Sequence, residues 1–79
     1  MKSLPPLKPR ELISILNNLG FIKIRQKGSH IFFKHPDGRT TLVPFHKGED
    51  IGKGLLRQII KETEISPEEI LKILKKEKK

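Results

Sequence analysis

The chain of 79 residues has no cysteine, no tryptophan and no tyrosine, and it has no long apolar run. Without cysteine it cannot form a disulfide framework or a zinc ribbon. No segment approaches the roughly 20 apolar residues that cross a bilayer, and three prolines interrupt MKSLPPLKP, where a signal peptide would be apolar. We therefore expect a cytoplasmic protein that does not act at a membrane.

The length of the chain limits the kind of site that it can build. A chain of this size buries about 60–65% of the surface that it exposes when unfolded, so its core is small. We expect a single domain over residues 1–79, with an irregular segment at 1–8 and a charged tail at 75–79. Any chemistry should then take place on an open surface and not in an enclosed cavity.

Positive charge dominates the chain and is concentrated in its middle. Lysine and arginine number 17 against 9 acidic residues, which gives a formal net charge of +8. Such an excess favours polyanionic partners, among them nucleic acids. Residues 21–47 contain six basic residues, one acidic residue and all three histidines. The lysine-rich C-terminus is expected to be a solvated end.

Apolar periodicity divides the chain into a helix, three strands and two further helices. Leucines and isoleucines recur at helical spacing after Pro9, which suits a first helical turn, and Gly20 suits the end of that helix. FIKIRQ and SHIFFKH alternate as strands do, TTLVPF is β-branched and apolar, and HPDGR has the residues of a tight turn. A second helix should begin near Gly52, and SPEE is a capping box that begins a third. The apolar stripe of the second helix is predicted to contain Leu55, Leu56, Ile59 and Ile60.

These elements predict an α+β fold with a three-stranded antiparallel sheet and the helices on one of its faces. The apolar stripes of all three helices should cover the apolar face of the sheet. Ile22 and Ile24 are predicted to lie on this buried face, because alternate residues of a strand share a face. The opposite, solvated face is predicted to display Lys23, Arg25, His30, Phe32 and Lys34.

The three histidines are poor candidates for a metal site. His30, His35 and His46 lie 5 and 11 residues apart, and the first two should point to opposite faces of one strand. The surrounding positive charge also repels a divalent cation. We therefore expect no metal site and no small-molecule cofactor.

A basic sheet face with a histidine and an aromatic ring suits chemistry on RNA. Cleavage through the 2′-hydroxyl needs a base to remove its proton and cations to hold the phosphate, and histidine is the natural base. On this hypothesis His30 is the catalytic residue, whereas His35 carries no more than charge. The candidate RNA contacts are Lys23, Arg25, Lys27, Ser29, Phe32, Lys34 and His46. The residues alone leave open that these are ordinary side chains of a solvated sheet.

Three motifs in order carry a resemblance to a known family. ELISILNNLGF, RQKGSHIFFKHPDGRTTLVPFH and GLLRQIIKETEISPEEIL together resemble the HicA-type toxins, also called the YcfA-like family, from about Arg10 to Leu74. The resemblance implies a fold similar to a double-stranded-RNA-binding domain, α-β-β-β-α, here with an extra C-terminal helix. It also implies an mRNA interferase of a type II toxin–antitoxin system, with its functional histidine in Gly-Ser-His at His30. The partner that it implies is a HicB antitoxin, which blocks the RNA site.

The leading hypothesis is therefore a stress-response toxin that cleaves mRNA as a metal-independent endoribonuclease. His30 would be its general base or acid, and an acidic HicB-type antitoxin would hold it inactive. Two other functions stay open on the residues alone. One is a non-catalytic RNA-binding module that uses the basic sheet face and Phe32, and the other is an adaptor whose open sheet edge recruits a partner strand.

Overall fold

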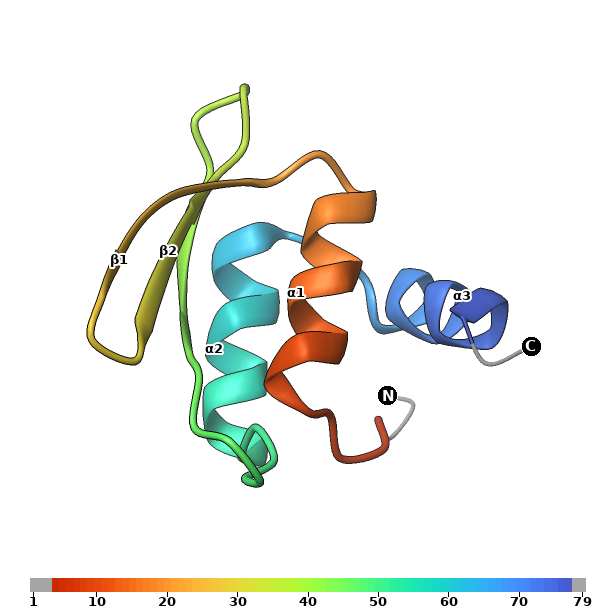
Figure 1. The fold of residues 1–79 in the computed structure, drawn as a ribbon. Coiled ribbons are helices and arrows are strands. Elements are labelled where there is room, and N and C mark those ends of the chain that lie inside the picture. The colour runs from red at the N-terminus through yellow and green to blue at the C-terminus, as the bar shows by residue number, and fades with distance from the viewer. Residues whose placement is uncertain (1–3, 78–79) are drawn as a thin grey trace.

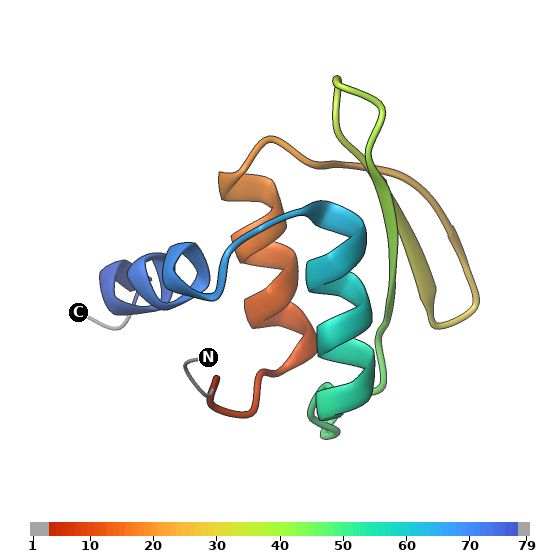
Figure 2. The same cartoon turned by 180° about the vertical axis from the view of Figure 1, so that it is seen from behind.

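The computed structural model describes residues 4–77 and has the predicted α+β architecture. A three-stranded sheet lies on one side, α1 and α2 lie side by side against one of its faces, and α3 lies beyond α1 (Figure 1). The reverse view shows the same layers, and no helix of the described residues lies over the other face of the sheet (Figure 2). The elements are α1 (Pro9–Asn18), β1 (Ile22–Lys27), β2 (His30–Lys34), β3 (Thr40–Pro44), α2 (Lys53–Thr63) and α3 (Pro67–Glu77).

The helices begin and end at the residues that the sequence indicates. Pro9 is the first residue of α1, and Gly20 follows its end with φ of 97°, a conformation that glycine adopts without strain. The α2 helix begins directly after Gly52. At α3 the capping box is formed, because the Glu69 amide donates to Ser66 Oγ at 3.1 Å and the Ser66 amide donates to Glu69 Oε1 at 3.2 Å.

Two tight turns set the order β1-β2-β3 of the antiparallel sheet. Between β1 and β2, Gly28 and Ser29 form a two-residue connection, with Gly28 at φ of 59°. Between β2 and β3, the Arg39 amide donates to Asp37 Oδ1 at 3.0 Å and Gly38 has φ of 101°. The strand β3 ends at Pro44, as expected of a residue that cannot donate to the ladder.

One hydrophobic core joins the sheet to the helices, and α3 enters it from an unexpected side. Ile70 and Leu74 of α3 are buried, but α3 packs against α1 and not against the sheet, so the prediction that its stripe covers the sheet is wrong. The helices α1 and α2 pack on the sheet at β3, and α3 lies on the far side of α1. The largest side chains of the core are Phe21, Phe33, Leu7, Leu12, Ile15, Leu16, Ile59 and Ile70.

Two details of the core differ from the prediction. Leu7 lies in the irregular segment, yet its side chain is only 1% exposed, and its carbonyl accepts the Ile51 amide at 2.6 Å. This bridge ties the N-terminal segment to the loop before α2. Leu55 was predicted in the apolar stripe of α2, but it is 36% exposed, because Leu56 and Ile59 already occupy the buried side of that helix.

The first strand differs most from the prediction. Ile22 and Ile24 were expected on the buried face, but they are 60% and 55% exposed, and every residue of β1 is exposed. The register shifts between Lys23 and Arg25, as it does at a β-bulge, which bends an edge strand. In Figure 1, β1 arches away from the helices, so that they do not reach under it.

The ends of the chain add little to this arrangement. Lys75 and Lys76, at the start of the predicted tail, are exposed residues of α3. The last two lysines of that tail, residues 78–79, lie outside the described residues, as do residues 1–3. Within the described part of the chain, no helix has both the length and the apolar character needed to span a membrane.

Candidate functional site

The face of the sheet that no helix covers is the candidate functional surface, and we call it the open face. Residues directly opposite each other in an antiparallel pair share a face, so the register defines its members. The helix side of the sheet contains the buried residues Ile31, Phe33, Thr41 and Val43. The open face consists of Ile22, Arg25 and Lys27 on β1, His30, Phe32 and Lys34 on β2, and Thr40, Leu42 and Pro44 on β3.

His30 lies on the central strand, at the end of the sheet where the β1–β2 hairpin turns. It is the first residue of β2, opposite Lys27 on one side and Pro44 on the other. Successive side chains of a strand point to opposite faces, so His30, which follows the Gly28–Ser29 turn, points away from the face on which Ile31 is buried. The side chain of His30 is exposed, as predicted.

Arg25 and Phe32 form the centre of the open face. They are directly opposite each other on β1 and β2, and the guanidinium carbon of Arg25 lies 4.8 Å from the centroid of the Phe32 ring. This is a cation–π contact. The Phe32 ring is half-buried, so the pair presents a flat, positively charged surface two residues along β2 from His30.

Lys23 is not part of the open face, although it was predicted there together with Arg25. It is opposite Phe33, whose side chain is buried on the helix side. Its Nζ donates to Gln26 Oε1 at 3.0 Å, and Gln26 is opposite the buried Ile31. The bulge between Lys23 and Arg25 is the cause, because one extra residue reverses the alternation of the strand.

Within the described residues, the cations of the open face are not paired with carboxylates. The Asp37 carboxylate, on the β2–β3 turn, forms an ion pair with Arg39 and lies 3.1 Å from His35 Nδ1. Arg25, Lys27 and Lys34 are exposed and take part in neither contact. Their charge is therefore available to an anionic ligand.

Ser29 and His46 lie beside the open face and not on its paired positions. The Ser29 carbonyl accepts the Phe45 amide at 2.6 Å, so the hairpin turn is tied to the end of β3. His46 is exposed in the loop that follows β3.

His35 has a structural role that the sequence analysis missed. Its ring packs edge-on against Phe21, with the centroids 5.1 Å apart, and its Nδ1 accepts the Asp37 amide at 3.1 Å. Gly20 lies directly against the ring, since a Cβ built there would be 2.9 Å from His35 Nε2. The expectation that His35 carries no more than charge is therefore wrong. The sequence signal was Gly-Phe after the first helix, which leaves room for a ring and offers another to pack on it.

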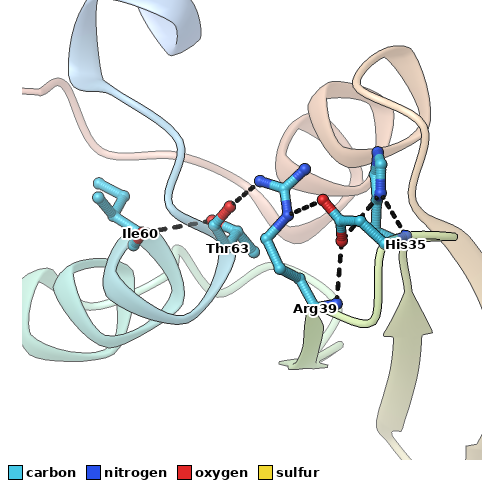
Figure 3. Close-up of polar contacts among 5 residues, drawn as sticks. His35, Arg39, Ile60 and Thr63 are labelled. Atoms are coloured by element: carbon cyan, nitrogen blue, oxygen red, sulfur yellow. Dashed lines mark hydrogen bonds and ion pairs between the residues drawn. The ribbon is translucent and has the colours of Figure 1, made fainter.

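Arg39 continues this cluster from the turn to the second helix (Figure 3). Its Nε donates to Asp37 Oδ2 at 2.8 Å, and a terminal nitrogen donates to the Thr63 carbonyl at the end of α2. Its guanidinium carbon also lies 5.1 Å from the centroid of Phe21. The hydrogen bond from the Arg39 amide is the main reason why the pKa of Asp37 is lower than its ordinary value of 3.8.

The described residues offer no ready ligand set for a metal. Nowhere in residues 4–77 do three side chains of histidine, aspartate, glutamate or cysteine gather closely enough to hold an ion. What the open face offers instead is an exposed imidazole, three exposed cations and an aromatic ring.

Comparison with models of protein families gives a match over most of the chain. The family described as HicA toxin of bacterial toxin-antitoxin matches residues 9–65, which run from the start of α1 to the turn after α2. A comparison with curated protein sequences finds no significant match.

Proposed function

Because the chain belongs to the HicA toxin family of bacterial toxin–antitoxin systems, we propose that it is an endoribonuclease that cleaves mRNA, with His30 as its general base. Membership makes the protein a toxin and implies a cognate antitoxin. The observation that carries the proposed mechanism is the exposure of His30 on a sheet face whose cations form no ion pair with a carboxylate of the described residues.

The proposed reaction uses the 2′-hydroxyl of the RNA as the nucleophile. His30 removes its proton, the 2′-oxygen attacks the adjacent phosphorus, and the bond from phosphorus to the 5′-oxygen breaks. The proton ends on the 5′-oxygen, directly from His30 or through water, and the products carry a 2′,3′-cyclic phosphate and a 5′-hydroxyl. Such proton transfer contributes about 10²–10⁴-fold to a rate.

The other side chains of the open face hold the RNA in this proposal. Lys27 is nearest in the register to His30 and is suited to the scissile phosphate, where negative charge grows in the transition state. Arg25 and Lys34 contact neighbouring phosphates, and the Arg25–Phe32 pair stacks with a base. Lys23 is left out, because its side chain lies on the other face.

The test compares purified wild type with His30→Ala and His30→Gln on a long RNA, in the presence and absence of a chelator. His30 is exposed, so both variants should unfold at the same temperature as the wild type. We expect both to lose at least about 100-fold in cleavage rate, and we expect the chelator to change nothing. Cleavage by His30→Ala at the wild-type rate would contradict the proposal.

A non-catalytic RNA-binding module is the second candidate, and the Arg25–Phe32 pair favours it equally. Growth assays and binding measurements on a His30 variant together separate the two. If the protein is a binding module, the variant keeps its effect on growth. If it is an endoribonuclease, the variant loses that effect but keeps its affinity for an RNA that cannot be cleaved.

The proposed antitoxin is an acidic, HicB-type protein that covers the open face. Charge complementarity supports this, because Arg25, Lys27 and Lys34 share that face and form no ion pair within the part of the chain that the structure describes. Complex formation should then weaken steeply with salt and should compete with RNA. An antitoxin that binds wild type and an Arg25→Glu variant equally well would argue against this placement.

A further inference from the structure

A groove lies where the N-terminus of α1 meets the loop after β3. Its volume is about 440 Å³. The bridge between Leu7 and Ile51 holds these two segments together, so both walls are anchored to the core. The residues that line the groove are Lys8, Pro9, Arg10, Phe45, His46, Lys47, Gly48 and Glu49.

The lining combines positive charge with an exposed aromatic ring. Lys8, Arg10 and Lys47 are exposed cations, whereas Glu49 is the one carboxylate among the lining residues. Phe45 is 37% exposed, although a large apolar side chain is more stable when it is buried. Cations beside an exposed aromatic ring are the combination with which proteins hold single-stranded nucleic acid, since the ring stacks on a base and the cations follow the backbone.

One wall of the groove begins close in the sheet to the proposed catalytic histidine. Pro44, the last residue of β3, is directly opposite His30, and Phe45 follows it. The Phe45 amide donates to the Ser29 carbonyl at 2.6 Å, which ties this wall to the turn that precedes His30. An RNA strand that passes over His30 and Pro44 would therefore come within reach of Phe45.

We propose that this groove binds the single-stranded RNA segment next to the nucleotide at His30. Phe45 stacks on a base, and Arg10 and Lys47 contact the phosphates on either side of it. This assigns His46 to the wall of a binding groove and not to proton transfer. The inference rests on the proposed function for its ligand, but its test does not require cleavage.

The test measures the affinity of the full chain for 2′-fluoro RNA, which lacks the nucleophile and cannot be cleaved. Two labelled oligonucleotides are compared, a trinucleotide that covers only the open face and a decanucleotide that also reaches the groove. The variants are Phe45→Ala, Phe45→Leu and Arg10→Ala. Lys72→Ala is the control for lost charge, because Lys72 is exposed on α3, remote from the sheet.

We expect Phe45→Ala to weaken decanucleotide binding about fivefold or more, which is the usual effect of losing one stacked base. Arg10→Ala should lower the slope of log affinity against log salt by about 0.7, the value for one phosphate contact on a single strand. Neither variant should change trinucleotide binding by more than Lys72→Ala does. Phe45→Leu, which keeps an apolar side chain of similar size, should bind as weakly as Phe45→Ala.

Three results would overturn the inference. Unchanged decanucleotide binding would remove the groove from the RNA path, and equal losses for both lengths would mean a general loss of charge or fold. Unchanged RNA binding with weaker binding of the antitoxin would make the groove a protein contact. If the wild type binds RNA with the expected length dependence but does not cleave it, the groove stands and the proposed chemistry fails.

Discussion

Arg25 lies over the ring of Phe32, with 4.8 Å between its guanidinium carbon and the ring centroid, because β1 contains a bulge. Lys23 is opposite Phe33, so regular pairing from there would place Arg25 opposite the buried Ile31. With the extra residue at the bulge, Arg25 instead shares the open face with Ile22, whereas Lys23 lies on the other face.

The Arg25–Phe32 pair should act as one unit in RNA binding. Arg25→Ala and Phe32→Ala should each weaken the affinity for 2′-fluoro RNA about five- to tenfold, since one removes a phosphate contact and the other a stacking surface. The double variant should lose less than the product of the two, because each side chain positions the other. Fluorescence anisotropy of a labelled oligonucleotide measures all four proteins. Strictly multiplicative losses would show that the two side chains act separately.

Arg39 should matter for stability and not for cleavage. Arg39→Ala removes the donor to the Thr63 carbonyl and the contact with Phe21, so we expect the free energy of unfolding to fall by about 1–3 kcal/mol. Arg57→Ala is the matched control, because Arg57 is exposed on α2, and it should stay within about 0.5 kcal/mol of the wild type. Urea unfolding followed by circular dichroism makes the comparison. If the folded Arg39→Ala protein lost its cleavage activity, Arg39 would belong to the functional site.

Asp37 should make stability depend on pH in the acidic range. The Arg39 amide donates a hydrogen bond to the ionised Asp37 carboxylate and stabilises it, so the pKa of Asp37 lies below 3.8 in the folded chain. A carboxyl group whose pKa falls on folding stabilises the protein above its unfolded pKa, and this stabilisation is lost as the pH falls through its folded pKa. The wild type should therefore be more stable than Asp37→Asn at neutral pH, and the difference should shrink as the pH falls below 3.8.

Urea unfolding at a series of pH values measures this difference. Asp50→Asn, in the loop before α2, is the control for the loss of one carboxylate. A difference between wild type and Asp37→Asn that does not change with pH would rule out the carboxylate as its source.

Gly20 should tolerate a side chain less well than Gly38, although both have positive φ, 97° and 101°. Alanine at either position costs about 1–2 kcal/mol of backbone strain. At Gly20 the added Cβ would also meet His35 Nε2 at 2.9 Å, whereas at Gly38 it would meet nothing within 4 Å. The His35 ring is held by Phe21 and Asp37, so it cannot move away freely. The free energy of unfolding of Gly20→Ala should thus be about 1 kcal/mol lower than that of Gly38→Ala. Thermal or urea unfolding of the two variants checks this.

The reverse order of stability would mean that the His35 ring moves without cost. Gly54→Ala serves as the third member of the set, because Gly54 lies inside α2 with open space around it and no positive φ. It should be at least as stable as the wild type, since alanine favours a helix over glycine.

Local signals in the sequence predicted much of the fold, because single side chains decide those features. The capping box of Ser66 and Glu69, the turn at Asp37 and the end of β3 at Pro44 formed as expected. The exposure of His30 followed from simple alternation along β2.

The features that the sequence did not predict depend on tertiary packing. A β-bulge leaves no mark in the alternation of FIKIRQ, so Ile22 and Lys23 were assigned to the wrong faces. Whether α3 packs on the sheet or on α1 depends on the space that the other helices leave. The burial of Leu7 depends on its bridge to Ile51, 44 positions along the chain, and no local pattern indicates such a contact.

The chemical ends of the RNA fragments test the central claim most directly. If His30 activates the 2′-hydroxyl, fragments made by the wild type should end in a 2′,3′-cyclic phosphate, and an RNA with 2′-deoxyribose at the cleavage position should resist cleavage. His30→Ala should produce no fragments with these ends above background. Fragments with a 3′-hydroxyl and a 5′-phosphate, or cyclic ends formed at the wild-type rate by His30→Ala, would contradict the account.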